Sequence, residues 1–198
     1  MRIRELIEID AAGTTRRDFL KAAAVSAAAL ALPHVAMAAA PALSPSSWPS
    51  FRNGNSLRGI AGSSLPEKLD LLWKAEVQDG VTATAAIVGD HVYAGTYGGE
   101  LICFQRRTGD RLWTHYSAEK KKPNDFIPGF QASPTVFGEL VLIGDEDGIF
   151  HAVDRATGEL RWKYETMAEI ISSAAVVQHP KIKDRIIVGR ADIGVRGD

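Results

Sequence analysis

The sequence predicts an all-β fold, a partial β-propeller of four-stranded antiparallel blades, from three observations. The first is a Thr-Gly pair followed by a Trp four residues after the Gly. It occurs at Thr108-Gly109 with Trp113 and again at Thr157-Gly158 with Trp162. The second is that upstream positions repeat in the same register, 49 residues apart: Gly89, Gly95 and Gly99 recur as Gly138, Gly144 and Gly148. The third is the period, because a repeat of ~40–50 residues is the length of a propeller blade.

Each repeat reads as an antiparallel meander, with blades at about residues 82–116 and 130–166. In the second blade, an apolar run at 141–144 is followed by the turn pair Asp147-Gly148 and a strand at 149–154. The Thr157-Gly158 turn then leads into an outer strand at 160–165. Because the sheet of a blade buries both faces against its neighbours, we expect Trp113 and Trp162 to lie between blades. Each ring should cover the Thr-Gly turn of an adjacent unit.

The propeller is expected to span residues 69–190, with a closing strand before the two full blades and half a blade after them. The closing strand is predicted at 69–77 around Trp73, and the half blade begins at 171–177 and returns at 185–189. Residues 191–198 break the pattern and are predicted to be an irregular tail. Because open blade edges invite association, two interpretations follow. The favoured one is the first half of a longer protein; the alternative is a short protein that closes its ring by self-association.

The first 38 residues are predicted to be a cleavable, helical or disordered export signal outside the fold. Arg16 and Arg17 are followed by Phe-Leu-Lys, as in the twin-arginine export motif, and an apolar run covers 22–32. Ala36 and Ala38 form a small-x-small cleavage site. The run is shorter than the ~20 residues that span a bilayer. We therefore expect a periplasmic or exported protein, cleaved after Ala38, in which residues 39–68 form an extended leader.

Composition excludes several classes of function. The formal net charge is −1, which argues against binding to nucleic acid or to a strongly anionic surface. Cys103 is the one cysteine, so no disulfide can form within the chain. Its strand position predicts a buried, inert thiol.

The repeat resembles that of the pyrroloquinoline-quinone-like (PQQ-like) propeller family, whose motif is about A-x-D-x-x-T-G-x-x-x-W. The second copy matches the motif at all five positions: Ala152, Asp154, Thr157, Gly158 and Trp162. The first copy keeps Thr108, Gly109 and Trp113 but has Cys103 and Gln105 in place of Ala and Asp. The resemblance covers roughly residues 48–190 and implies a propeller fold, while leaving activity open.

The resemblance raises the question of a quinone site. Quinone-dependent alcohol dehydrogenases of this fold use an adjacent Cys pair, a Trp floor and a calcium site, and one Cys cannot form that pair. The acidic cluster Asp145-Glu146-Asp147 is predicted to be a solvated turn. The histidines, His91, His115, His151 and His179 among them, lack the spacing of a metal site or triad. No catalytic, cofactor-binding or metal-binding residue is therefore predicted.

The favoured function is an exported, non-catalytic scaffold that binds an unknown protein partner through blade-connecting loops. In this respect the chain resembles the propeller scaffold of the outer-membrane barrel-assembly machinery. The connector at 117–129, which contains Lys120, Lys121 and Lys122, is the candidate surface. The alternative is the N-terminal part of a PQQ-dependent dehydrogenase with calcium, a class that twin-arginine export modestly favours. A third interpretation is a fragment without a stable fold.

Overall fold

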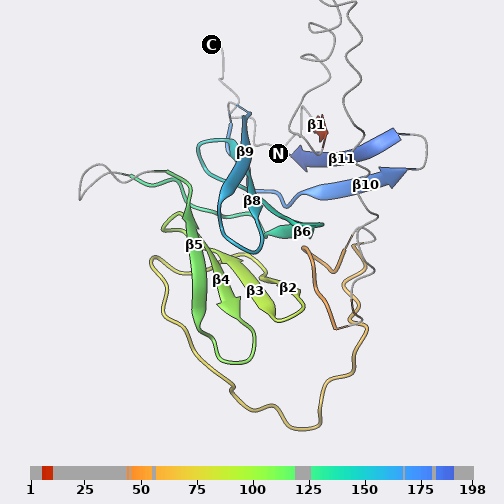
Figure 1. The fold of residues 1–198 in the computed structure, drawn as a ribbon, viewed down its shortest axis with the longest axis vertical. Coiled ribbons are helices and arrows are strands. Elements are labelled where there is room, and N and C mark those ends of the chain that lie inside the picture. Colours follow the sequence, from red (N-terminus) through yellow and green to blue (C-terminus); the bar gives the residue numbers. More distant parts are fainter. Residues whose placement is uncertain are drawn as a thin grey trace, which may run out of the picture.

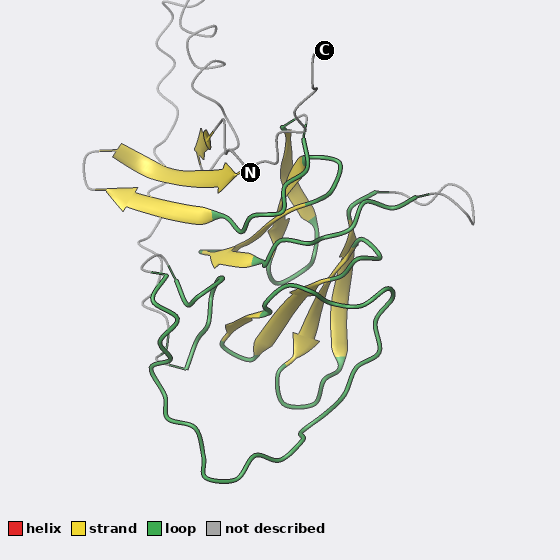
Figure 2. Cartoon of the chain, turned by 180° about the vertical axis from the view of Figure 1, so that it is seen from behind, coloured by secondary structure: helices red, strands yellow, loops and turns green. Residues whose placement is uncertain are grey.

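The computed structural model describes residues 6–10, 44, 46–54, 57–118, 126–166, 168–179 and 182–189. These residues form strands, turns and loops, and none of them is helical (Figure 2). No helix among them is long and apolar enough to cross a membrane.

Two four-stranded antiparallel sheets carry the fold, and they lie side by side (Figure 1). The first sheet is ordered β2-β3-β4-β5 and the second β6-β7-β8-β9, so each is a simple meander. The bounds are β2 (Ala86–Val88), β3 (His91–Gly95), β4 (Glu100–Gln105), β5 (Arg111–Tyr116), β6 (Thr135–Phe137), β7 (Leu140–Gly144), β8 (Ile149–Asp154) and β9 (Leu160–Glu165). Both sheets have a register shift at the same place, between Cys103 and Phe104 and between Ala152 and Val153. The two sheets are therefore copies of one blade.

The hydrophobic core consists of separate clusters that lie between successive blades. A central cluster joins residues of the first blade, such as Leu101 and Cys103, to Val141 and Ile143 of the second. The opposite face of the first blade packs Ile102 and Phe104 against residues that precede it in the chain. The opposite face of the second blade packs against the start of a third unit. Each strand thus sends alternate side chains into two different interfaces, as radially stacked sheets require.

A third sheet has the order β1-β11-β10, with β1 (Leu6–Asp10), β10 (Ala175–His179) and β11 (Ile182–Gly189). The pairing of β10 with β11 agrees with the predicted half blade. The placement of β1 differs from the sequence analysis, which left residues 6–10 outside the fold. One edge of β11 pairs with β10. The backbone groups on its other edge form hydrogen bonds with β1, an extended segment that contains Leu6, Ile7 and Ile9.

The predicted closing strand differs from the structure, because residues 69–77 belong to no sheet. A strand needs a hydrogen-bonded neighbour, and none of the described strands lies along this segment. The leader also differs in part. Trp48 forms a two-bond bridge with Ile87 on β2, and the Pro49 carbonyl accepts a bond from the Val136 N–H at 2.7 Å. The segment around Trp48 therefore joins the innermost strands of both blades.

Candidate functional site

The repeated Thr-Gly turns and tryptophans form the joints between units. Trp73 lies on Gly109, and a Cβ added there would be 2.6 Å from the ring. Trp113 lies on Gly158 in the same way, with a corresponding distance of 2.8 Å. Both indole N–H groups donate to a backbone carbonyl of the same turn, Trp73 to Arg106 at 2.8 Å and Trp113 to Arg155 at 3.1 Å. The Trp-over-turn packing expected from the repeat thus occurs twice.

Trp162 is the third tryptophan at this position of the repeat. It packs against Phe150 with ring centroids 6.0 Å apart and belongs to the cluster facing the third sheet. Within the described residues, no Thr-Gly turn lies over its ring.

Asp154 organises the turn that follows β8. Its Oδ1 accepts bonds from the Ala156 and Thr157 N–H groups, and Arg161 donates to its Oδ2 at 2.6 Å. The Arg161 hydrogen bond is the main cause that lowers the pKa of Asp154 to about 2. At the equivalent position of the first blade, the Gln105 side chain accepts from the Arg107 N–H at 3.0 Å. Gln therefore replaces Asp without leaving the turn uncapped.

A ladder of hydroxyl groups links successive units at their inner ends. The Thr84 N–H donates to Ser133 Oγ at 3.0 Å, and the Ser133 N–H donates to Ser173 Oγ at 3.1 Å. Beside the ladder lies a cavity of about 390 Å³. Its lining is Phe51, Leu57, Thr82, Ala83, Thr84, Gln131, Ser133, Ile171, Ser172, Ser173, Ala174 and Ala175.

This inner cavity fits a quinone cofactor poorly. PQQ carries three carboxylates, and calcium needs several converging oxygen ligands, carboxylates above all. The residues that line the cavity offer hydroxyl groups and one amide but no cation and no carboxylate. No group of three or more metal-ligating side chains is found among the described residues. The lining of this cavity therefore offers no charged partner for the carboxylates of PQQ.

A buried polar chain joins the two blades, and the sequence analysis missed it. Asp145 and His151 are 0% and 2% exposed, and their Oδ2 and Nε2 atoms lie 2.9 Å apart. His151 Nδ1 lies 3.2 Å from Nε2 of His115, which comes from β5 of the first blade. Asp145 Oδ1 also accepts from the Ile149 N–H at 2.8 Å. With Asp145 Oδ2 as the acceptor, His151 donates from Nε2, and His151 Nδ1 then accepts from His115 Nε2.

The hydrogen-bonded group formed by Asp145, His151 and His115 corrects two expectations from the sequence. Two of the four histidines named in the sequence analysis, His115 and His151, come together although they are 36 residues apart, because β5 and β8 face each other across the blade interface. Asp145 is not a solvated turn residue, since it is fully buried. Burial, with the nearby His151 as a second cause, lowers the pKa of His115 to about 4. No sequence spacing signals this site, because it depends on the stacking of two blades.

Glu146, the next residue of the acidic turn, also has a structural task. Its Oε2 accepts from the Gly129 N–H at 2.9 Å, and its Oε1 accepts from the Gln131 side chain. It therefore anchors the end of the connector between the blades. Asp147 is exposed. Partial desolvation of its carboxyl group by neighbouring residues raises its pKa, with Asp145 and Glu146 as weaker causes.

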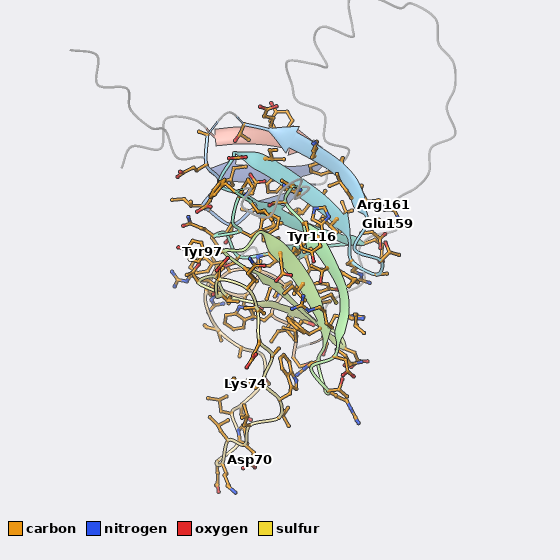
Figure 3. The ribbon with its side chains drawn as sticks, turned by 90° about the vertical axis from the view of Figure 1, so that its left-hand side faces the viewer. Asp70, Lys74, Tyr97, Tyr116, Glu159 and Arg161 are labelled. Carbon is orange, nitrogen blue, oxygen red and sulfur yellow. The ribbon has the colours of Figure 1, made fainter. Side chains whose placement is uncertain are left out.

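A larger groove lies beside the predicted partner-binding connector. It has a volume of about 650 Å³ and is lined by Gln78, Gly98, Glu100, Tyr116, Ser117, Ala118, Ile127, Leu160 and Lys163. Tyr116, at the end of β5 (Figure 3), is 53% exposed. Two more exposed aromatics are near in the chain, Tyr97 at 39% and Phe126 at 73%. The groove therefore combines aromatic surface with one carboxylate and one ammonium group.

The remaining predicted residues are placed as follows. Cys103 is buried, and burial raises the pKa of its thiol to about 12, which keeps it protonated and unreactive. Arg16, Arg17, Ala36 and Ala38 lie outside the described residues, as do Lys120 to Lys122 and the tail at 191–198. Ala152 is fully buried in the interface with the third sheet. Thr108 donates to the Asp110 carboxylate at 2.6 Å within its turn.

Meander blades stacked face to face, with Trp-over-turn joints between them, define this chain as a propeller protein of the PQQ-like repeat class. Residues 68–197 match the family described as outer membrane protein assembly factor BamB, and the chain belongs to that family. Residues 13–33 match the twin-arginine translocation pathway signal sequence. The chain is therefore exported across the cytoplasmic membrane to the periplasm.

Its relatives include an outer membrane protein assembly factor and several alcohol dehydrogenases. Quinohemoprotein alcohol dehydrogenase ADH IIB of Pseudomonas putida is 28% identical over 125 residues, 60% of this chain and 17% of that protein. BamB of Shewanella oneidensis is 24% identical over 132 residues, 52% of this chain and 33% of that protein. The crystal structure of the quinohemoprotein alcohol dehydrogenase of Comamonas testosteroni superposes with a TM-score of 0.51 at 21% identity. It covers 67% of this chain and 22% of that one, a likeness that shows the fold alone. The chain thus spans a third or less of the length of these relatives.

Proposed function

We propose that this protein is a non-catalytic scaffold that binds another periplasmic protein in the groove beside the connector at 117–129. The observation that carries the proposal is the exposure of Tyr116 in a groove that also holds Glu100 and Lys163. Tyr is enriched at the energetic centres of protein interfaces, where its ring adds contact area and its hydroxyl adds a hydrogen bond. The exposed Lys163 ammonium group adds specificity for an acidic group on the partner, whereas Glu100 is buried and pairs with Arg111 at 3.2 Å.

The anchoring of the connector supports this role. Glu146 holds Gly129, and the Ser117 hydroxyl donates to the Pro128 carbonyl at 2.6 Å. The Ser117 N–H also donates to the Gly99 carbonyl at 3.0 Å, so the two ends of the connector are joined to each other and to the blades. A binding loop on a rigid base loses less conformational entropy when a partner binds.

Site-directed photo-crosslinking in the periplasm tests the proposal. A photoreactive residue is placed at Tyr116 or Ile127, which both line the groove, and matched controls are placed at the exposed positions Lys68 and Glu159. We expect a protein adduct of one defined mass from the groove positions and none from the controls. Equal adducts at all four positions, or none at any, would refute the proposed surface.

The second candidate is part of a quinone-dependent dehydrogenase, and the relatives favour it. Besides the Pseudomonas putida enzyme, they include a lanthanide-dependent methanol dehydrogenase that is 29% identical over 114 residues. The inner cavity argues against this candidate, because its lining is uncharged. Purified protein is mixed with PQQ and calcium, and alcohol-dependent reduction of a dye is measured. The scaffold proposal predicts no quinone-dependent rate above that of a heat-denatured control, and a clear rate would replace it with the dehydrogenase.

A further inference from the structure

The inner cavity beside the hydroxyl ladder is enclosed by four segments that are far apart in the chain. The leader contributes Phe51 and Leu57. The three successive units contribute lining residues within 82–84, 131–133 and 171–175, each at the entry to the innermost strand of its unit. The walls of the cavity are therefore set by the packing of the units and of the leader against one another.

Two serine hydroxyl groups of this cavity still have a proton to donate. Ser133 Oγ accepts from the Thr84 N–H and Ser173 Oγ accepts from the Ser133 N–H, and neither hydroxyl donates to a described residue. A serine hydroxyl carries one donor and two lone pairs. Ser133 is only 5% exposed, and a buried donor without an acceptor lowers stability. Since both serines line the cavity, an oxygen atom of a bound ligand would satisfy these donors.

Gln131 supplies an acceptor in the same cavity. Its Nε2 atom donates to the Glu146 carboxylate, and its Oε1 atom accepts from no described residue. The carboxylate can only accept, so this contact fixes which end of the amide is the donor. The polar wall therefore offers both donors and an acceptor. Alcohol groups, which donate and accept at the same oxygen, complement such a wall.

The rest of the lining is apolar and partly open to solvent. Phe51, Leu57 and Ile171 are 45%, 44% and 39% exposed although they line a concave site. The ring of Phe51 adds a flat hydrophobic face. The C–H face of a pyranose ring can cover such a surface while the hydroxyl groups at the ring edge reach the polar wall. Apolar walls with a few placed polar groups are typical of small-molecule sites.

Charge and size narrow the class of ligand further. No residue of the lining is charged, so an ion bound there would lose its hydration without gaining a counter-charge. The volume of about 390 Å³ lies within the range of ~300–1,000 Å³ that is usual for small-molecule sites. We propose that this cavity binds a neutral mono- or disaccharide, with the hydroxyl ladder and Gln131 on its polar edge and Phe51 on its apolar face.

The first experiment measures binding in solution. Amide chemical shifts of the isotope-labelled exported protein are followed by NMR while glucose, N-acetylglucosamine or maltose is added. We expect saturable shifts at Thr84, Ser133 and Ser173 with at least one of these sugars, at a dissociation constant of about 10 mM or below. Glucuronate is the matched control, because it adds a carboxylate to the same ring and should bind about ten times more weakly. The proposal fails if none of the three sugars gives saturable shifts, or if glucuronate binds as tightly.

The second experiment locates the site. Phe51→Ala removes the apolar face and Ser173→Ala removes one hydroxyl donor, whereas Phe126→Ala removes an exposed aromatic ring outside the cavity. We expect the first two variants to bind the sugar about five times more weakly or worse and the third to bind it unchanged. Thermal denaturation verifies that each variant is folded. Unchanged binding by both Phe51→Ala and Ser173→Ala would overturn the proposal. Neither residue lines the groove at Tyr116, so this site and the proposed function can fail independently.

Discussion

At the scale of single residues, the blade joint depends on two glycines that lack a side chain where a Trp ring lies. Gly158 has a φ of 79°, and Trp113 lies against it; Gly109 has a φ of 78° and lies under Trp73. Gly is needed there for two reasons, since positive φ strains other residues and a Cβ would overlap the ring. The Thr-Gly-x-x-x-Trp spacing therefore records a contact between neighbouring blades.

The structure offers a matched pair of substitutions for this joint. Gly158→Ala adds strain and overlap, so we expect the free energy of unfolding to fall by about 2–4 kcal/mol. Gly138→Ala has a φ of 57° with open space around the new Cβ, so we expect a loss of about 1 kcal/mol from strain alone. Urea denaturation of both variants measures the difference. Equal losses would show that the Trp113 contact adds nothing to the backbone effect.

His115 is expected to make stability depend on pH. Its folded pKa is about 4, below the ~6.5 of an unfolded chain, so between these values the unfolded state binds more protons. The free energy of unfolding therefore falls as pH drops from about 6.5 to 4, by an amount on the order of 3 kcal/mol. His115→Gln keeps a donor for His151 but does not titrate, so its stability should change less across this window. Denaturation at several pH values compares the two proteins, and parallel curves would exclude His115 as the cause.

At the scale of elements, whether a segment becomes a strand depends on its neighbours as well as on its own sequence. Residues 71–76 and β9 share four residue types and the same inward packing, yet β9 pairs with β8 and residues 71–76 pair with no described strand. β1 shows the converse, because it becomes a strand where β11 offers an open edge. A segment with strand propensity therefore forms a strand only where a neighbouring strand can hydrogen-bond to it.

The hydroxyl ladder is the element-scale contact that is simplest to test. Ser133→Ala removes the acceptor of the Thr84 N–H and leaves that donor unpaired at the inner end of the blades. We expect a loss of about 1–3 kcal/mol in the free energy of unfolding. Ser46→Ala, at an exposed position, is the control, with an expected change within about 0.5 kcal/mol. Thermal and urea denaturation measure the stability of both variants. Equal effects would show that the hydrogen bond between Thr84 and Ser133 does not stabilise the fold.

At the scale of the whole molecule, stability should be uneven. The central strands β4 and β8 are buried on both faces, whereas residues 71–76 pair with none of the described strands. We expect amides of β4 and β8 to exchange with solvent slowest, and those of residues 71–76 to exchange at nearly unfolded rates in dilute, monomeric protein. Hydrogen exchange followed by mass spectrometry measures this. Strong protection of residues 71–76 in the monomer would show that another part of the same chain pairs with them.

Much of the blade architecture could be predicted from the sequence because it is local. The turns, the strand lengths and the inward-facing tryptophans all lie within one repeat of 49 residues, and strand alternation leaves few alternative arrangements. The export signal was readable for the same reason, since Arg16 and Arg17 act as a linear motif.

The contacts between repeats could not be predicted in this way. Asp145, His151 and His115 meet because the face of β5 lies on the face of β8, and no spacing along the chain encodes that approach. The groove beside Tyr116 and the pairing of β1 with β11 also join distant segments. The sequence by itself determined the class of fold and the route of export. Only the tertiary structure decided which polar groups are buried together and which strand edges stay open, because both depend on how separate sheets pack.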